Sequence, residues 1–185
     1  REVGDDVESF KTALRYVVRQ DPDVILVGEM RDIETFEFAL TAAETGHLVL
    51  ATLHSSTVSQ TIGRILDLFP PDRHSQIRQL LKFNLKAIIS QRLLKGSSKE
   101  HPRVPAVELM ITNPPIRKAL EEGEDEKISE IIMNNKKNGM QTFNQSLVQL
   151  VKDNHISRET ALKASPNSEA LEMNLKGIYL GTEKA

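Results

Sequence analysis

The sequence predicts an α/β fold in which a parallel sheet with helices on its faces is followed by an all-helical segment. Two short, mainly apolar runs, Val24–Val27 and His47–His54, are typical of strands covered on both faces. Helical patterns precede, separate and follow these runs, and such alternation is typical of a layered α/β sheet. After Asn113-Pro114-Pro115, turn residues separate several short helical patterns, which indicates an all-helical segment.

The composition is that of a water-soluble globular domain. The chain has 185 residues, of which 39% are hydrophobic and 27% charged, and its net charge is −2. This charge gives no broad attraction to nucleic acid or to an anionic membrane. The absence of cysteine excludes disulfides and cysteine-ligated zinc, and it suits a reducing cytoplasm. Because the chain opens with Arg1 rather than Met, we expect upstream sequence to be missing.

The first predicted helix carries an apolar stripe, with Ser9 as its candidate N-cap. The stripe consists of Phe10, Ala13, Leu14, Val17 and Val18. After the strand Val24–Val27, a second stripe has Asp32 as its N-cap and Gly46 just beyond its end. This second stripe consists of Ile33, Phe36, Leu40 and Ala43. The second strand, His47–His54, follows.

The middle of the chain predicts two more helices and one strand. The first helix buries Val58, Ile62, Ile65, Leu66 and Phe69 and is stopped by Pro70 and Pro71. A long helix is predicted from Asp72 to Leu94. Its inward side chains are expected to be Ile77, Leu80, Leu81, Leu85, Ile88 and Leu93. A polar loop then spans Gly96–Pro105, and Val104–Ile111 is predicted as a strand.

Four short helices are predicted in the last third of the chain: Ile116–Glu122, Lys127–Asn134, Met140–Asp153 and Ser157–Ala164. A further helix is expected around Leu171, Leu175 and Ile178. We therefore expect two domains, with residues 1–112 forming the α/β core and residues 113–185 a helical subdomain.

Candidate chemistry lies where the two predicted parallel strands end. Glu29 follows the first strand and His54 ends the second, and ligands of open parallel sheets bind beyond the carboxyl ends of strands. Such a carboxylate and imidazole could act on a polarised water and a phosphate. Locally, Glu29 could equally be a first-turn acid and His54 a turn or capping residue. The spacing of His47 and His54 does not fit a zinc site, and no third ligand is evident.

Several motifs resemble one family in the same order. Asp21–Asp32, followed by Glu34 and Thr35, is similar to the Walker B segment of secretion and pilus ATPases. Thr45–His54 is similar to their histidine box. Shorter matches are found at Arg1–Gly4, Ser90–Leu93 and Gly139–Thr142. The chain thus resembles type IV pilus retraction ATPases of the PilT type, in the secretion ATPase superfamily, over roughly residues 1–155.

The resemblance implies a RecA-like motor domain, incomplete at its N-terminus, that uses ATP and Mg²⁺. Glu29 matches the catalytic Walker B acid, which orients the attacking water or acts indirectly in the Mg²⁺ shell. The usual Walker B Asp is replaced by Gly28, a departure that the family shares. His54 matches the histidine near the γ-phosphate. His47 and Arg31 are further cofactor-binding candidates, His47 being farther from the nucleotide and Arg31 also suited to shaping the loop or contacting a neighbouring subunit.

Two absences refine this expectation. The chain contains no Gly-x-x-x-x-Gly-Lys-Ser/Thr phosphate-binding loop, so we expect the chain alone to bind ATP poorly and not to hydrolyse it. It also lacks the four cysteines of the zinc module of assembly and type II secretion ATPases, which favours the retraction branch. Pro115–Glu122 aligns with the retraction motif Ala-Ile-Arg-Asn-Leu-Ile-Arg-Glu but has Glu121 where that motif has arginine.

The function implied for the longer protein is an ATP-hydrolysing homo-hexamer that powers pilus retraction and twitching motility. Its expected partner is the inner-membrane pilus platform, met at the cytoplasmic face, with membrane association only through partners. Alternatives are an accessory retraction motor, a related secretion ATPase, or a non-hydrolysing scaffold. A nucleic-acid translocase is disfavoured because the chain has no concentrated basic stripe.

Overall fold

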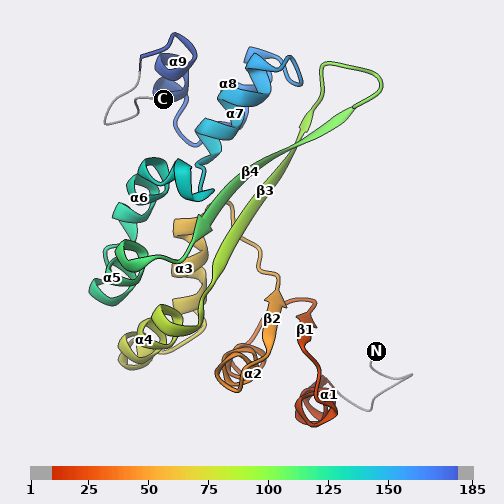
Figure 1. Ribbon diagram of the computed structural model, residues 1–185, viewed down its shortest axis with the longest axis vertical. Helices are drawn as coiled ribbons and strands as arrows, with labels where there is room; N and C mark the ends of the chain where they lie inside the picture. Colours follow the sequence, from red (N-terminus) through yellow and green to blue (C-terminus); the bar gives the residue numbers. More distant parts are fainter. Residues whose placement is uncertain (1–9, 179–185) are drawn as a thin grey trace. The chain divides into compact units, whose positions relative to one another are not determined.

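The computed structural model describes residues 10–178, which form two compact units (Figure 1). The first unit contains the chain up to His54 together with Gly63–Asn84. The second contains Ser55–Ile62 and the chain from Leu85 onward. Ser9 and the Arg1–Gly4 stretch, which the sequence analysis singled out, lie outside the described residues.

The first unit holds a two-stranded parallel sheet, as predicted. Strand β1 (Val24–Val27) pairs with β2 (Leu48–Ala51), and the register matches Val24 to Leu48 and Val27 to Ala51. Helix α1 (Phe10–Val17) precedes β1, and helix α2 (Ile33–Glu44) connects the two strands. Ile25 and Val27 of β1 pack with Ala42 of α2 to form the core of this sheet.

Helix α2 begins where the sequence predicts it. Asp32 is its N-cap, and a carboxylate oxygen of Asp32 accepts a hydrogen bond from the backbone N–H of Thr35 at 2.8 Å. This contact satisfies one of the N–H groups that have no partner within the helix. At the other end, Gly46 adopts a φ of +97°, a conformation that favours glycine.

The predicted long helix from Asp72 to Leu94 is wrong. Helix α3 (Val58–Leu66) is followed by helix α4 (His74–Asn84), and the chain then forms strand β3 (Ala87–Lys95). Ile77 and Leu81 of α4 are buried as expected, but Leu93 on β3 is 56% exposed. The reason is that Ser90 and Arg92 lie on the same face of β3 as buried Ile88. Because these two residues are polar, apolar and polar side chains do not alternate along β3 as they do in a typical half-buried strand.

Strand β3 forms an antiparallel hairpin with β4 (Arg103–Ile111), which was predicted as a strand. The register pairs Ala87 with Ile111 and Lys95 with Arg103. The connecting turn lies in the predicted polar loop. There a Cβ on Gly96 would lie 1.8 Å from the carbonyl oxygen of His101, so only glycine fits this position.

The described part of the helical segment after β4 contains the four predicted short helices and the further helix expected around Leu171. Their bounds are α5 (Pro114–Glu122), α6 (Ile128–Asn134), α7 (Phe143–Lys152), α8 (Arg158–Ala164) and α9 (Ser168–Leu175). Asn113 caps α5, Thr142 caps α7 and Ser157 caps α8, each by accepting a backbone N–H bond. None of the helices in residues 10–178 is long and apolar enough to cross a membrane.

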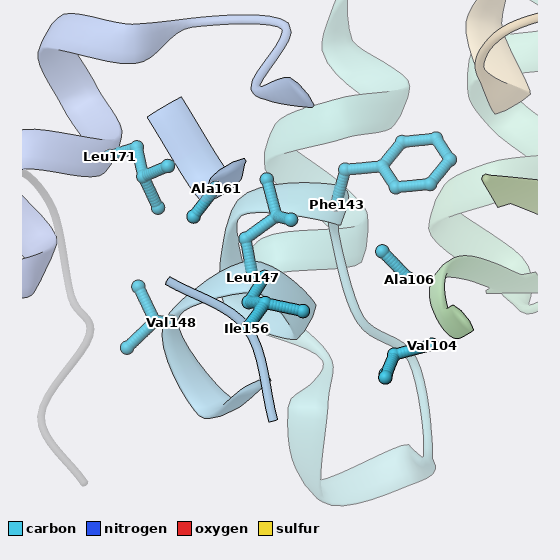
Figure 2. Close-up of a cluster of buried hydrophobic side chains, with 8 residues drawn as sticks. All are labelled: Val104, Ala106, Phe143, Leu147, Val148, Ile156, Ala161 and Leu171. Atoms are coloured by element: carbon cyan, nitrogen blue, oxygen red, sulfur yellow. The ribbon is translucent and has the colours of Figure 1, made fainter. Parts of the chain in front are cut away.

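One core joins helices α7, α8 and α9 to β4 (Figure 2). Phe143, Leu147 and Val148 of α7 pack against Val104 and Ala106 of β4. Ile156, Ala161 and Leu171 complete the same cluster. The hairpin therefore shares a hydrophobic core with the helical segment, while the predicted domain boundary after residue 112 stays a prediction.

Candidate functional site

The carboxyl ends of β1 and β2 lie together because the two strands are parallel and in register. Pairing continues beyond the strands, since the backbone N–H of Met30 donates to the carbonyl oxygen of Thr52 at 3.0 Å. The Thr52 hydroxyl also donates to the carbonyl oxygen of Gly28. These contacts fix the two segments that carry Glu29 and His54. Thr52 was not among the site residues predicted from the sequence, and its position at a strand end is the signal that points to it.

Glu29 contacts both Arg31 and His54. Nη2 of Arg31 lies 2.6 Å from one carboxylate oxygen of Glu29, and Nε2 of His54 lies 3.2 Å from the other. The side chain of Glu29 is 27% exposed, whereas those of Arg31 and His54 are 76% and 86% exposed. The structure thus brings together three of the four candidate site residues, with the carboxylate the least exposed. Their roles toward a nucleotide stay predictions.

The electrostatics of this cluster keep Glu29 ionised. The hydrogen bond from Arg31 is the main cause that lowers the pKa of Glu29, and the charges of Arg31 and His54 act in the same direction. Partial burial opposes this shift. Reciprocally, the hydrogen bond to Glu29 raises the pKa of the Arg31 guanidinium. At neutral pH, Glu29 is therefore a carboxylate that can accept hydrogen bonds.

Asp32 belongs to the helix rather than to this cluster. Its carboxylate accepts hydrogen bonds at the start of α2, and the bonds from Thr35 lower the pKa of Asp32. This charge at a helix N-terminus is stabilising, so the local structure accounts for Asp32 without a catalytic role.

His47 lies at the opposite end of β2 from His54. Its Nδ1 is 3.0 Å from the carbonyl oxygen of Ala42 and 3.1 Å from the hydroxyl oxygen of Thr45. Both partners belong to the C-terminal end of α2, where carbonyl groups lack helical partners. The structure gives His47 a contact at that helix end and does not bring it to Glu29, so its nucleotide-binding role stays a prediction.

The cluster is suited to a metal ion only as one part of a larger site. Within residues 10–178, no three His, Cys, Asp or Glu side chains gather so as to hold a metal ion. A single, partly exposed carboxylate does fit Mg²⁺, which keeps several waters and binds through one or two carboxylates together with substrate phosphates. Glu29, which follows the end of β1, has this chemistry.

Comparison with known proteins gives consistent results. Residues 5–171 match the family described as Type II/IV secretion system protein. The chain is 44% identical over 171 residues to a twitching motility protein of Neisseria gonorrhoeae, covering 92% of this chain and 46% of that protein. It is 45% identical over 161 residues to the type IV pilus retraction ATPase PilT of Pseudomonas aeruginosa, and this match covers 87% of this chain and 46% of that protein. The chain thus spans about half the length of these relatives.

A solved structure of similar fold supports the same assignment. The crystal structure of the pilus retraction motor PilT with bound ADP superimposes with a TM-score of 0.84 at 48% identity. This match covers 93% of the present chain and 48% of that structure's chain. It confirms the α/β, RecA-like fold class expected from the sequence. On the strength of the family match and these identities, the chain belongs to the Type II/IV secretion system protein family.

Proposed function

We propose that this chain is the C-terminal part of an ATPase that powers type IV pilus retraction and twitching motility. The observation that carries the proposal is the ionised Glu29 carboxylate beside His54 at the carboxyl edge of a parallel sheet. Support comes from relatives named as a twitching motility protein and a retraction ATPase, each matched over most of this chain. In α/β folds, this edge of the sheet is where nucleotides bind.

Glu29 acts as the catalytic acid–base group of the motor. Its carboxylate accepts a hydrogen bond from the attacking water and orients that water toward the terminal phosphate. Arg31 holds the carboxylate from one side through the 2.6 Å contact, which fixes its direction and keeps it ionised. When ATP is bound, Mg²⁺ would neutralise part of the negative charge on its phosphates, and Glu29 would contribute to the metal's outer shell.

His54 is the second group at this edge. Its Nε2 lies 3.2 Å from Glu29, and 86% of its side chain is exposed, so the ring is free to turn from the carboxylate to a phosphate oxygen. An imidazole N–H that donates to the phosphate would offset negative charge that develops during transfer.

The nucleotide site is completed by residues outside this chain. No Gly-x-x-x-x-Gly-Lys-Ser/Thr segment occurs in the sequence, and such a loop supplies the amides and the lysine that hold the phosphates. We expect the 185-residue chain to bind ATP poorly, without micromolar affinity in isothermal titration calorimetry. Binding with a micromolar Kd would contradict this expectation.

The assembly that we propose is a homo-hexameric ring at the cytoplasmic face of the bacterial inner membrane. The ring acts on the inner-membrane pilus platform and contacts the membrane only through such partners. It needs no nucleic acid, in keeping with the net charge of −2 of this chain.

The functional test uses bacteria from which the gene for the longer protein has been deleted. Loss of a retraction motor leaves pili on the cell surface but abolishes twitching, and expression of the intact gene restores twitching. Loss of an assembly motor instead leaves cells without pili. Cells without pili, or cells that still twitch normally, would contradict the proposal. Loss of twitching that is not restored by a Glu29→Gln gene ties the function to the site.

A further inference from the structure

The inward face of the β3–β4 hairpin carries an unusual set of polar side chains. Ser90 and Glu108 are directly opposed in the register and are only 5% and 6% exposed. Arg92 is paired with Ala106, so Arg92 and Glu108 are diagonal neighbours on the same face. Arg92 belongs to the Ser90–Leu93 motif, to which the proposed function gives no role.

Arg92 and Glu108 both bind the backbone that follows His54. Nη2 of Arg92 donates to the carbonyl oxygen of Ser56 at 3.2 Å. A carboxylate oxygen of Glu108 accepts the backbone N–H of Val58, the first residue of α3, at 2.7 Å. The Arg92–Glu108 pair therefore holds the main chain of residues 56–58 at two points, one through a carbonyl group and one through an N–H group.

Arg92 also binds the C-terminal helices. Its Nη1 donates to the carbonyl oxygen of Ala164, the last residue of α8, at 2.6 Å. Its guanidinium lies 4.7 Å from the centre of the Phe143 ring at the start of α7. One side chain thus connects α7 and α8 to the backbone of Ser56. Because Arg92 uses its planar group for two carbonyls and a ring face at once, lysine cannot replace it in all three contacts.

The Glu108 carboxylate is held in a costly environment, because Glu108 is 6% exposed. Burial raises the pKa of Glu108, although the Val58 N–H and the positive charge of Arg92 act against this shift. Apolar side chains would pack on this face without such a desolvation penalty. The contacts satisfy helix ends, since the Val58 N–H and the Ala164 carbonyl lack helical partners. Capping alone does not require that one arginine contact both α8 and the segment after His54.

We propose that the Arg92–Glu108 pair positions His54 by fixing residues 56–58, and that Arg92 transmits displacements of α7 and α8 to this segment. The proposal rests on the proposed ATPase function of Glu29 and His54. Ser56 is two residues from His54, a separation of at most about 7 Å along an extended chain. A shift of the Ser56 carbonyl is therefore passed to His54 through covalent bonds. Arg92 and Glu108 are positioning residues, since they act through His54.

The test compares ATPase kinetics in the longer protein that contains this chain. Arg92→Gln and Glu108→Leu are each expected to lower kcat about tenfold, with the KM for ATP changed by less than about twofold, because a mispositioned His54 affects the transition state more than ground-state binding. Arg158→Gln is the matched control, because it removes an exposed arginine whose partner is Glu172 and leaves the pair intact. Should Arg92→Gln fail to fold, Arg92→Lys keeps the charge and is expected to show the same pattern.

A double-mutant cycle distinguishes positioning from general destabilisation. If Arg92 acts through His54, adding Arg92→Gln to His54→Ala lowers kcat no further than His54→Ala does alone. Losses of kcat that multiply in the double variant would overturn the proposal, as would an unchanged kcat in Arg92→Gln and Arg92→Lys.

A second readout is independent of catalysis. Hydrogen exchange of the Val58 amide is expected to be at least about tenfold faster in Glu108→Leu than in wild type, with Arg158→Gln unchanged. If wild type hydrolyses no ATP, the proposed function fails, and this exchange experiment still tests whether the pair holds residues 56–58. Equal exchange in all three proteins would overturn the inference.

Discussion

Truncation of Leu147 tests the core that joins β4 to the C-terminal helices. Leu147 is 1% exposed and packs among the cluster shown in Figure 2. Leu147→Ala removes buried apolar atoms and leaves a cavity, which typically costs about 2–5 kcal/mol. A loss of about 3 kcal/mol corresponds to a roughly 150-fold change in the opening equilibrium, at 1.36 kcal/mol per factor of ten.

Native-state hydrogen exchange with mass spectrometry is the appropriate assay, because a chain with two compact units need not unfold in one two-state transition. Amides of α7 (Phe143–Lys152) that exchange through opening of this core should exchange about 100-fold faster in Leu147→Ala. Leu93→Ala is the matched control, because it makes the same truncation at a side chain that is 56% exposed. Its effect should stay within about 0.5 kcal/mol, or about twofold. Acceleration below about fivefold in Leu147→Ala, or equal acceleration in both variants, would refute the packing argument.

Two further predictions concern single carboxylates. Asp32→Ala should lower the free energy of unfolding by about 1 kcal/mol through loss of the N-cap of α2. The measurement is the urea concentration at which the amides of α2 lose half of their protection from hydrogen exchange. Hydrogen bonds lower the pKa of Asp32 in the folded protein, so Asp32 should stabilise the fold at pH values above 3.8, its ordinary pKa. This stabilisation should be lost as the pH falls through the pKa of Asp32 in the folded protein. A destabilisation by Asp32→Ala that acid leaves unchanged would contradict this. The pH dependence expected for Glu108 is the opposite, because burial raises its pKa in the folded protein. Wild type should therefore lose stability relative to Glu108→Gln as the pH rises from about 4.5 through the pKa of Glu108 in the folded protein. Urea midpoints of both proteins at pH 4 and pH 7 test this, and a difference that does not grow at pH 7 would contradict it.

The candidate site could be predicted from sequence because its geometry follows from a local rule. Parallel strands place their carboxyl ends at one edge, so Glu29 and His54 are expected to lie close together if both runs are neighbouring strands of one sheet. The contact with Arg31 could not be predicted, because it depends on how the chain turns after Gly28. The same rule separates His47 from Glu29, because His47 precedes β2 and Glu29 follows the opposite, carboxyl end of β1.

The hairpin was missed for a physical reason. Ile88, Ile89, Leu93 and Leu94 recur at spacings that fit a helix, whereas strand β3 turns Ser90 and Arg92 inward. Those two polar residues break the alternation that identifies a half-buried strand. Arg92 is accommodated there only because Ser56, Ala164 and Phe143 lie around it. Contacts between residues so distant in sequence leave no local pattern. For this reason neither strand β3 nor the Arg92–Glu108 pair could be predicted from the sequence.

The C-terminal helices were predicted because turn residues separate their apolar patterns locally. Their starts are set by the caps Asn113, Thr142 and Ser157, so α7 begins at Phe143 and not at the predicted Met140. What the sequence could not show is that α7 packs on β4, since that depends on side chains about forty residues apart, such as Ala106 and Phe143.

The central claim is that Glu29 is the catalytic carboxylate of a pilus retraction ATPase, and the most direct test is the ATPase rate of the longer protein beside its Glu29→Gln variant. Binding of a non-hydrolysable ATP analogue is measured in both, because glutamine keeps the size of the side chain but cannot act as the carboxylate. We predict that wild type hydrolyses ATP, and that the variant binds the analogue with similar affinity but hydrolyses ATP at least about 100-fold more slowly. Equal ATPase rates in the two proteins would contradict the account. So would the finding that both proteins bind the analogue but neither hydrolyses ATP.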